Sequence, residues 1–241
     1  MSKSYGQYCP VARAAEAICE RWTPLILREM MSGSCHFNEI SRGVPLMSRA
    51  LLIKRLKEME NTGLIIRQEK KTGQGSLYLL TEAGEALRPI IEAMGVWAQH
   101  WTSDRLTAEQ LDPELFMWSL RRGFNLDAMP EEKIVFQFDL RKIPKQGIQQ
   151  RSYWVVVEER RVDVCMQDPG FEVDILITAE LSAIVHVVMG YDPLDLALKS
   201  QKITFEGDRK LVSQIPTWLY LNQERRYLSG IAPKTLGEML G

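Results

Sequence analysis

The 241-residue sequence predicts an α+β protein made of two units. Helix patterns and one hairpin pattern fill residues 1–103, whereas five strand patterns among helices fill residues 110–241. The second pattern is typical of an α/β sandwich-like unit, with a mostly antiparallel five-stranded sheet covered by helices. Charge divides the chain too: residues 1–105 hold 14 Lys and Arg against 11 Asp and Glu, and the remainder holds 16 against 20. The two units therefore differ in pattern and in charge.

Four helix patterns open the first unit. Thr23 is the expected cap of the second pattern and Ser48 the expected cap of the fourth, while Gly63 stops the fourth. The first and third patterns cover Pro10–Cys19 and about His36–Ser41.

A hairpin and a long helix complete the first unit. The hairpin pairs the strand patterns Leu64–Ile66 and Leu77–Leu80 across the polar tip RQEKKTGQGS, and the helix pattern covers about Glu82–Trp101. A short helix, a turn and a basic helix before a two-stranded wing form a winged helix-turn-helix. The long helix carries more apolar surface than so small a unit covers, at Leu87, Ile90, Ile91, Met94, Trp97 and Trp101. We therefore expect a homodimer formed through the N-terminal helix and the 82–101 helix.

The fourth helix has an apolar face and a cationic face. Leu52, Leu56 and Met59 form one stripe at helical spacing. Because the major groove of DNA admits one α-helix and is read from the helix N-terminus, we expect Ser48, Arg49, Ala50 and Ile53 to lie nearest the bases. Phosphate contacts are expected from Lys54 and Lys57, and wing contacts from Lys70, Lys71 and Gln74.

A solvated helix face is the alternative interpretation of these cations. Lys54 and Glu58 have the spacing of a weak surface ion pair. The preceding short helix and the following wing favour the DNA-binding interpretation. Arg55 differs from the other cations, because its place beside the apolar stripe indicates pairing with an acid inside the unit.

The first unit resembles the HxlR family of bacterial transcriptional regulators. The resemblance lies in CPVARAAEAICERWTPLILREMMSGSCHFNEI, LMSRALLIKRLKEMENTGLIIR and YLLTEAGEAL, and covers about Cys9 to Trp101. It implies a dimeric winged helix bound to double-stranded, pseudo-palindromic DNA. The chain has His36-Phe37 where the family usually has Arg-Phe, which removes one backbone-facing cation.

Cys9 is a redox-sensing candidate, because the resemblance places it in the Cys-Pro-Val start that some family members use to sense electrophiles or oxidants. A helix N-terminus and Arg13 one turn further on favour a thiolate there. The alternative is that Cys9 packs as a small apolar residue. Cys165 lies in a strand pattern and is expected in the core. Without a CxxC pair or a signal-peptide core, a reducing cytoplasm is the expected location.

The second unit shows no catalytic motif of the phosphate-binding, nucleophile-elbow or zinc-protease kinds, so we expect a protein that is not an enzyme. Its histidine, His186, is widely separated from His36 and His100, and we expect neither a metal nor a cofactor.

Apolar residues are abundant in the second unit. They form either a packed core or a cavity for an apolar ligand. The segment VDILITAELSAIVHVVMGYDPLDLALKSQKITFEGDRKLVSQIPTWL resembles the sterol carrier protein-2 family, which implies a sheet covered by helices around a tunnel for an apolar ligand. The candidate ligand-binding residues are Phe136, Phe138, Trp154, Val156, Ile184, Val188, Leu198 and Trp218.

The sequence thus predicts a dimeric DNA-binding regulator, with an apolar small molecule in the second unit as a further partner. The alternative is a carrier of lipid or acyl ligands that its N-terminal unit merely dimerises.

Overall fold

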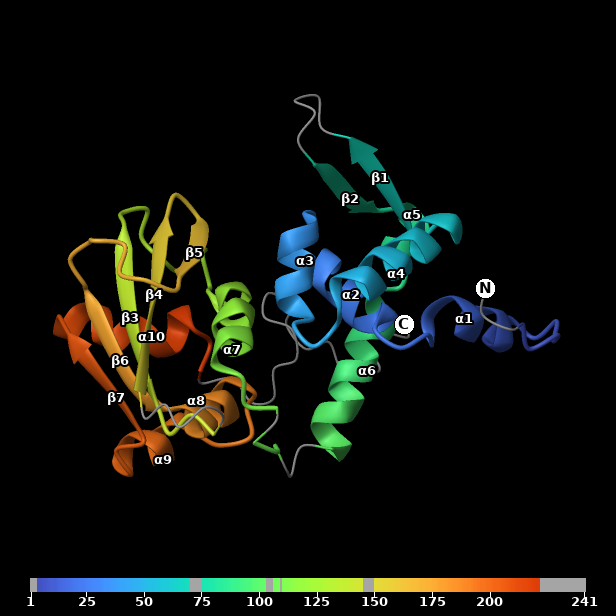
Figure 1. Ribbon diagram of the computed structural model, residues 1–241. Helices are drawn as coiled ribbons and strands as arrows, with labels where there is room; N and C mark the ends of the chain where they lie inside the picture. The colour runs from blue at the N-terminus through green and yellow to red at the C-terminus, as the bar shows by residue number, and fades with distance from the viewer. Residues whose placement is uncertain (1–3, 70–74, 103–105, 109, 145–149, 222–241) are drawn as a thin grey trace. The chain divides into compact units, whose positions relative to one another are not determined.

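The computed structural model describes residues 4–69, 75–102, 106–108, 110–144 and 150–221 (Figure 1). The chain forms two compact units, Met1–Met94 and Gly95–Gly241. The division falls inside a helix, before residues 104–109, which separate the two predicted units. Within the described ranges, no helix is both long enough and apolar enough to cross a membrane.

The first unit has the predicted order of helices and wing. Its elements are α1 (Pro10–Ile18), α2 (Thr23–Met31), α3 (Phe37–Gly43), α4 (Arg49–Asn61), β1 (Ile65–Glu69), β2 (Ser76–Leu80), α5 (Glu82–Glu85) and α6 (Arg88–Trp101), the last of which continues into the second unit. The wing strands pair antiparallel, from Ile65 opposite Leu80 to Glu69 opposite Ser76.

The ends of α4 confirm the predicted signals. Ser48 Oγ accepts a hydrogen bond of 3.3 Å from the Leu51 amide, which satisfies a donor that the first turn of a helix leaves unpaired. Gly63 follows the helix with φ +75°, a left-handed conformation that glycine adopts without steric cost. The prediction for α2 was wrong by one residue, since Thr23 is the first helical residue and Trp22 is the cap.

The prediction of one continuous helix from Glu82 to Trp101 was wrong. The chain forms α5 and then α6, because Pro89 lies in the second position of α6. Proline has no amide hydrogen to donate, and its ring would meet the carbonyl of Glu85 in a continuous helix. The side chain of Arg88 lies at the break and pairs with Glu85 at 2.6 Å.

Helices α2, α3 and α4 and strand β1 enclose the first core. Its fully buried residues include Ile26, Leu27, Ile40, Leu52, Leu56, Met59 and Ile65. A buried acid lies beside them: the Glu29 carboxylate is fully buried and accepts a 2.8 Å hydrogen bond from Arg28. The same Arg28 donates to the Gly43 carbonyl at 3.0 Å, so it ties α2 to the end of α3.

The second unit is a five-stranded sheet with helices. Its elements are α7 (Pro113–Leu120), a short 3-10 helix η1 (Arg121–Gly123), β3 (Ile134–Arg141), β4 (Gln150–Glu158), β5 (Arg161–Cys165), β6 (Ile175–Glu180), α8 (Leu181–Val188), α9 (Leu194–Lys199), β7 (Ile203–Gly207) and α10 (Arg209–Trp218). The strand order is β5-β4-β3-β6-β7.

The sheet is mixed, which corrects the prediction of a mostly antiparallel sheet. Strand β6 runs parallel to β3, whereas the other neighbouring strands are antiparallel. After β5 the chain returns to the centre of the sheet, and Asp174 fixes it there. The Asp174 amide donates to the Val135 carbonyl at 3.0 Å, and its carboxylate accepts from the Val135 amide at 2.8 Å.

One face of this sheet carries the second core. Side chains from β3, β4 and β6 meet side chains from α7, α8, α9 and α10 there. Phe136 lies at the centre, with edge-on contacts to Phe124 at 5.3 Å and to Trp218 at 6.3 Å between ring centroids. Aromatic pairs of this geometry stabilise a core beyond the area that they bury.

Candidate nucleic-acid interface

Helix α4 has the two faces that its sequence predicts. Leu52 is fully buried, and Leu56 and Met59 are each only 2% exposed. On the other side Ile53 is 59% exposed, and the side chains of Lys54 and Lys57 are 68% and 66% exposed. We call Ser48, Arg49, Ala50, Ile53, Lys54 and Lys57 the outer face of α4; all six are exposed.

Both lysines of the outer face lie near acids of the same helix. Lys57 Nζ is 2.9 Å from Glu60 Oε2, and Lys54 Nζ is 4.0 Å from Glu58 Oε1. Exposed ion pairs of this kind contribute only about 0–1 kcal/mol. A phosphate group can therefore replace either acid at little cost in free energy.

Arg49 is held at the N-terminal end of the outer face by α3. Its guanidinium carbon lies over the Phe37 ring, 4.8 Å from the centroid, and its Nη2 lies 3.5 Å from Asn38 Oδ1. Ser48 uses its oxygen as an acceptor for the helix cap and keeps its hydroxyl hydrogen for donation. The small side chain of Ala50 lets another molecule approach the backbone closely.

Arg55 pairs inside the unit, as the sequence predicts. Its side chain is 12% exposed and forms ion pairs with Glu58 at 2.7 Å and with Glu20 at 3.3 Å. Since Glu20 follows α1, this arginine links α1 to α4.

The wing is described only in part. Lys70, Lys71 and Gln74 lie outside the described residues. The wing strands also present a cation that the sequence reasoning missed: Arg67 on β1 is exposed, and its Nε donates to Ser76 Oγ at 2.9 Å. The predicted strand ends at Ile66 and leaves Arg67 in the hairpin tip, because an exposed strand has no apolar alternation to mark its length.

The amino-acid sequence matches known proteins over both units. Residues 17–105 match the HxlR-like helix-turn-helix family. The uncharacterized HTH-type transcriptional regulator YvaP of Bacillus subtilis is 35% identical over 97 residues, which cover 39% of this chain and 90% of YvaP. The chain belongs to the HxlR-like helix-turn-helix family. Another relative, the HTH-type transcriptional regulator YodB of the same organism, is 35% identical over 39% of this chain and 85% of YodB.

Solved structures give a likeness to part of the chain. The reduced form of YodB from B. subtilis has 32% identity and a TM-score of 0.36, and covers 42% of this chain and 100% of YodB. In the second unit, residues 128–219 match the SCP-2 sterol transfer family.

The predicted ligand-binding residues of the second unit fall into three groups. Phe136, Phe138, Ile184 and Trp218 are buried in the core, and Val188 packs against it. Leu198 on α9 is 37% exposed. Trp154 and Val156 lie on the opposite face of the sheet, so the eight residues do not surround one space.

The register of β4 explains why Trp154 and Val156 lie apart from the core. Phe138 pairs with Tyr153 and Phe136 with Val155, and directly paired residues point to the same face. Side chains of a strand alternate between faces, so Tyr153 and Val155 enter the core and their neighbours do not. The sequence could not show this phase, because both sets of side chains in Tyr153–Val157 are apolar.

Tyr153 is the most unusual polar residue of this core. Its side chain is fully buried, and its hydroxyl has no hydrogen-bond partner among the described residues. Burial raises the pKa of Tyr153 to about 12, because the phenolate loses its hydration; nearby Arg151 lowers it and Glu114 and Asp112 raise it by smaller amounts.

The cysteines differ in environment. Cys9 is partly exposed and is the cap residue of α1, where its carbonyl accepts from the Arg13 amide at 3.1 Å. Cys165 is in β5 but lies opposite Trp154, so the expectation that it belongs to the core was wrong. Burial, with a smaller contribution from Asp163, raises the pKa of the Cys165 thiol, which disfavours the reactive thiolate.

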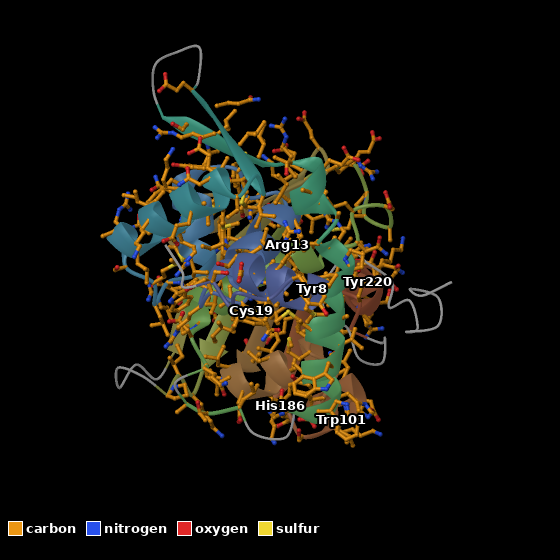
Figure 2. The ribbon with its side chains drawn as sticks, turned by 90° about the vertical axis from the view of Figure 1, so that its right-hand side faces the viewer. Tyr8, Arg13, Cys19, Trp101, His186 and Tyr220 are labelled. Atoms are coloured by element: carbon orange, nitrogen blue, oxygen red, sulfur yellow. The ribbon has the colours of Figure 1, made fainter. Side chains whose placement is uncertain are left out.

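Exposed apolar side chains gather on α6 and around α1. Ile90, Met94, Trp97 and Trp101 follow a 4-3-4 spacing on one side of α6, with Trp97 60% and Trp101 69% exposed. Tyr5, Tyr8 and Val11 are exposed at the N-terminal helix. Figure 2 labels Tyr8, which precedes α1, Arg13 on α1 and Trp101 at the end of α6.

Proposed function

We propose that this HxlR-family chain is a transcriptional regulator that binds double-stranded, pseudo-palindromic DNA as a homodimer. The outer face of α4 is the observation that carries the proposal. It presents Arg49 at the reading end of the helix and Lys54 and Lys57 further along, on a helix whose other face is fixed in the core. The HTH-type regulators YvaP and YodB support the same function by their similarity to this region.

The dimer is proposed from the exposed apolar stripe of α6 together with the N-terminal helix. A monomer rarely leaves such a run of large apolar side chains in water. A two-fold dimer presents two copies of α4 to two half-sites of a palindrome.

Lys54→Glu and Lys57→Glu, made together, test the DNA-binding surface. We expect the double variant to lose specific DNA binding, because each change turns a phosphate-neutralising cation into a repelling anion. The DNA site is first selected from genomic fragments with purified wild-type protein, and affinity is then measured by fluorescence anisotropy. The matched control is Lys199→Glu, since Lys199 is an equally exposed helical lysine paired with Asp195 in the second unit. Unchanged DNA affinity in the double variant would show that the outer face of α4 is not the contact surface.

For the second unit we propose an apolar effector, on the strength of its match to the SCP-2 sterol transfer family. The proposed contacts are the core residues Phe136, Phe138, Ile184 and Trp218, with Val188 beside them. An effector acts only if it binds the DNA-competent and incompetent states with different affinity. Native mass spectrometry of purified protein, followed by DNA titration with and without delipidation, checks this. No co-purified ligand and no change on adding fatty acids or acyl esters would end the effector proposal.

The alternative function is a carrier of hydrophobic ligands that the HxlR-like unit dimerises. The same experiments separate the two functions, because a carrier binds lipid but selects no DNA sequence. In neither function does the chain act as an enzyme.

A further inference from the structure

A hollow of about 640 Å³ lies in the first unit between α1 and α4. One wall carries Glu16 and Ala17 of α1 with Glu20 just beyond it, and the other carries Lys54, Arg55 and Met59 of α4. Small-molecule sites in proteins have volumes of roughly 300–1,000 Å³. The hollow thus has the size of a ligand site, and one of its walls is the helix proposed to contact DNA.

The α1 wall offers an acid that no cation neutralises. Glu16 Oε1 accepts hydrogen bonds from Ser4 Oγ at 2.8 Å and from the Tyr5 amide at 2.6 Å, both of which are neutral donors. Among the described residues, Glu16 forms no ion pair and its Oε2 accepts no hydrogen bond. The Glu16 carboxylate is therefore available to a cationic group in the hollow.

The α4 wall offers a cation instead, Lys54. Arg55 divides its guanidinium between Glu20 and Glu58, and its Nε is buried, so this arginine and the two acids satisfy one another. Lys54 Nζ is 4.0 Å from Glu58, beyond ordinary hydrogen-bonding distance. Lys54 can therefore bind an anionic group without breaking a strong existing contact.

We propose that the α1–α4 hollow binds a dipeptide-sized zwitterion with apolar side chains, whose ammonium group pairs with Glu16 and whose carboxylate is bound by Lys54. Ala17 and Met59 provide apolar surface between the two charged ends. A ligand with only a positive charge leaves Lys54 unused, and one with only a negative charge leaves Glu16 unpaired. The two walls thus select a molecule that carries both charges.

Lys54 couples this site to DNA, a consequence that rests on the proposed function. Lys54 belongs both to the hollow and to the outer face of α4. When it binds the ligand carboxylate, its charge is no longer available to a DNA phosphate. The zwitterion is therefore an effector that weakens DNA binding.

Isothermal titration calorimetry of the full chain with leucyl-phenylalanine tests the site. The comparison ligands are the N-acetyl form, which lacks the ammonium group, and the C-terminal amide, which lacks the carboxylate. We expect each blocked form to bind about tenfold or more weakly than the parent dipeptide, because each loses one charge-assisted contact. Equal affinity of all three, or no binding of the dipeptide, overturns the proposal without requiring any variant.

Glu16→Gln then locates the ammonium contact. Glutamine still accepts from Ser4 and Tyr5 but has no charge. We expect weaker binding of the dipeptide and of the amide, with unchanged binding of the N-acetyl form. Glu132→Gln, an exposed acid of the second unit, is the matched control and should bind all three ligands as the wild type does. If Glu16→Gln changes the oligomeric mass and not ligand affinity, the hollow belongs to contacts with a second copy and the proposal is overturned.

DNA binding measured by anisotropy completes the test. We expect leucyl-phenylalanine to weaken wild-type DNA binding, and binding of the dipeptide without this effect overturns its role as an effector. If the ligand-free protein selects no DNA, the proposed function fails while the calorimetric result stands. If calorimetry fails with DNA binding intact, only the ligand site fails.

Discussion

The guanidinium carbon of Arg49 lies 4.8 Å from the centroid of the Phe37 ring, so the first residue of α4 is held over the first residue of α3. Asn38, next along α3, lies within 3.5 Å of the same guanidinium. An exposed cation–π contact contributes about 0.5–1 kcal/mol. In a helix read from its N-terminus, this contact restricts the arginine before DNA arrives and so lowers the entropy lost on binding.

Phe37→Leu tests this restriction. Leucine keeps an apolar side chain against the first core but removes the aromatic face beneath Arg49. We expect about threefold weaker binding to the selected DNA site, the loss of roughly one exposed cation–π contact, and little change for unrelated DNA. Competition anisotropy with both DNAs measures the difference. Phe171→Leu is the control, because Phe171 makes a similar contact with Lys133 in the second unit. An equal loss for both DNAs would show that Phe37 acts through stability of the unit and not through Arg49.

The apolar stripe of α6 predicts a dimer that a single charge disrupts. Trp97 lies between Met94 and Trp101 in the stripe and is 60% exposed in the single chain. We expect Trp97→Glu to weaken dimerisation about 30-fold or more, the loss typical of a central interface tryptophan. Sedimentation velocity across a concentration series measures it. Leu196→Glu, at an exposed leucine of α9, should leave the mass unchanged. A wild-type chain that sediments as a monomer contradicts the assignment.

At Gly43, near the end of α3, the structure leaves no room for a larger side chain. A methyl group at this position would overlap the carboxyl group of Glu29, which is fully buried and bound to Arg28. We expect Gly43→Ala to lower the free energy of unfolding by about 1–3 kcal/mol, as overpacking usually does. Urea denaturation measures the change. In a Glu29→Ala background the same substitution should cost clearly less, since the obstacle is gone; additive losses would place the strain elsewhere.

Replacing Tyr153 by phenylalanine is expected to cost no stability. Because its buried hydroxyl has no partner among the described residues, Tyr153→Phe removes an unsatisfied group, and we expect unfolding free energy to stay level or rise by about 1 kcal/mol. The fully buried Phe138 beside it serves as the contrast, since Phe138→Ala should cost about 3–5 kcal/mol. A clear loss of stability in Tyr153→Phe would reveal a hydrogen bond to the hydroxyl.

The pKa of Tyr153 also predicts a dependence on pH. The folded value of about 12 lies above the ordinary value of 10.0, so folding favours the protonated phenol. Below pH 10 the folded and unfolded chains both keep that proton, and the group causes no change in stability. Between about pH 10 and 12 the unfolded chain loses the proton first, so stability falls as pH rises. Thermal unfolding across this range should show a smaller decline in Tyr153→Phe than in the wild type.

Local signals in the sequence were sufficient to predict the helix ends and the buried face of α4 in the first unit. Ser48 and Gly63 marked the ends of α4 because capping and left-handed turns depend on a few adjacent residues. Leu52, Leu56 and Met59 fixed the buried face because their spacing follows the helical period. The break between α5 and α6 also has a local cause, Pro89. The apolar periodicity on both sides of Pro89 favoured the prediction of one continuous helix.

By itself, then, the sequence determined most helices and strands, the two faces of α4 and the family resemblance of each unit, since all of these depend on residue type and spacing. Only the tertiary structure decided that β6 lies parallel to β3, that Tyr153 and not Trp154 enters the core, and that Glu20 reaches Arg55. These features depend on pairings between segments distant in the chain. When both faces of a strand are apolar, or an arginine has several acids in reach, local spacing favours no single partner, and the packing of the whole unit selects one.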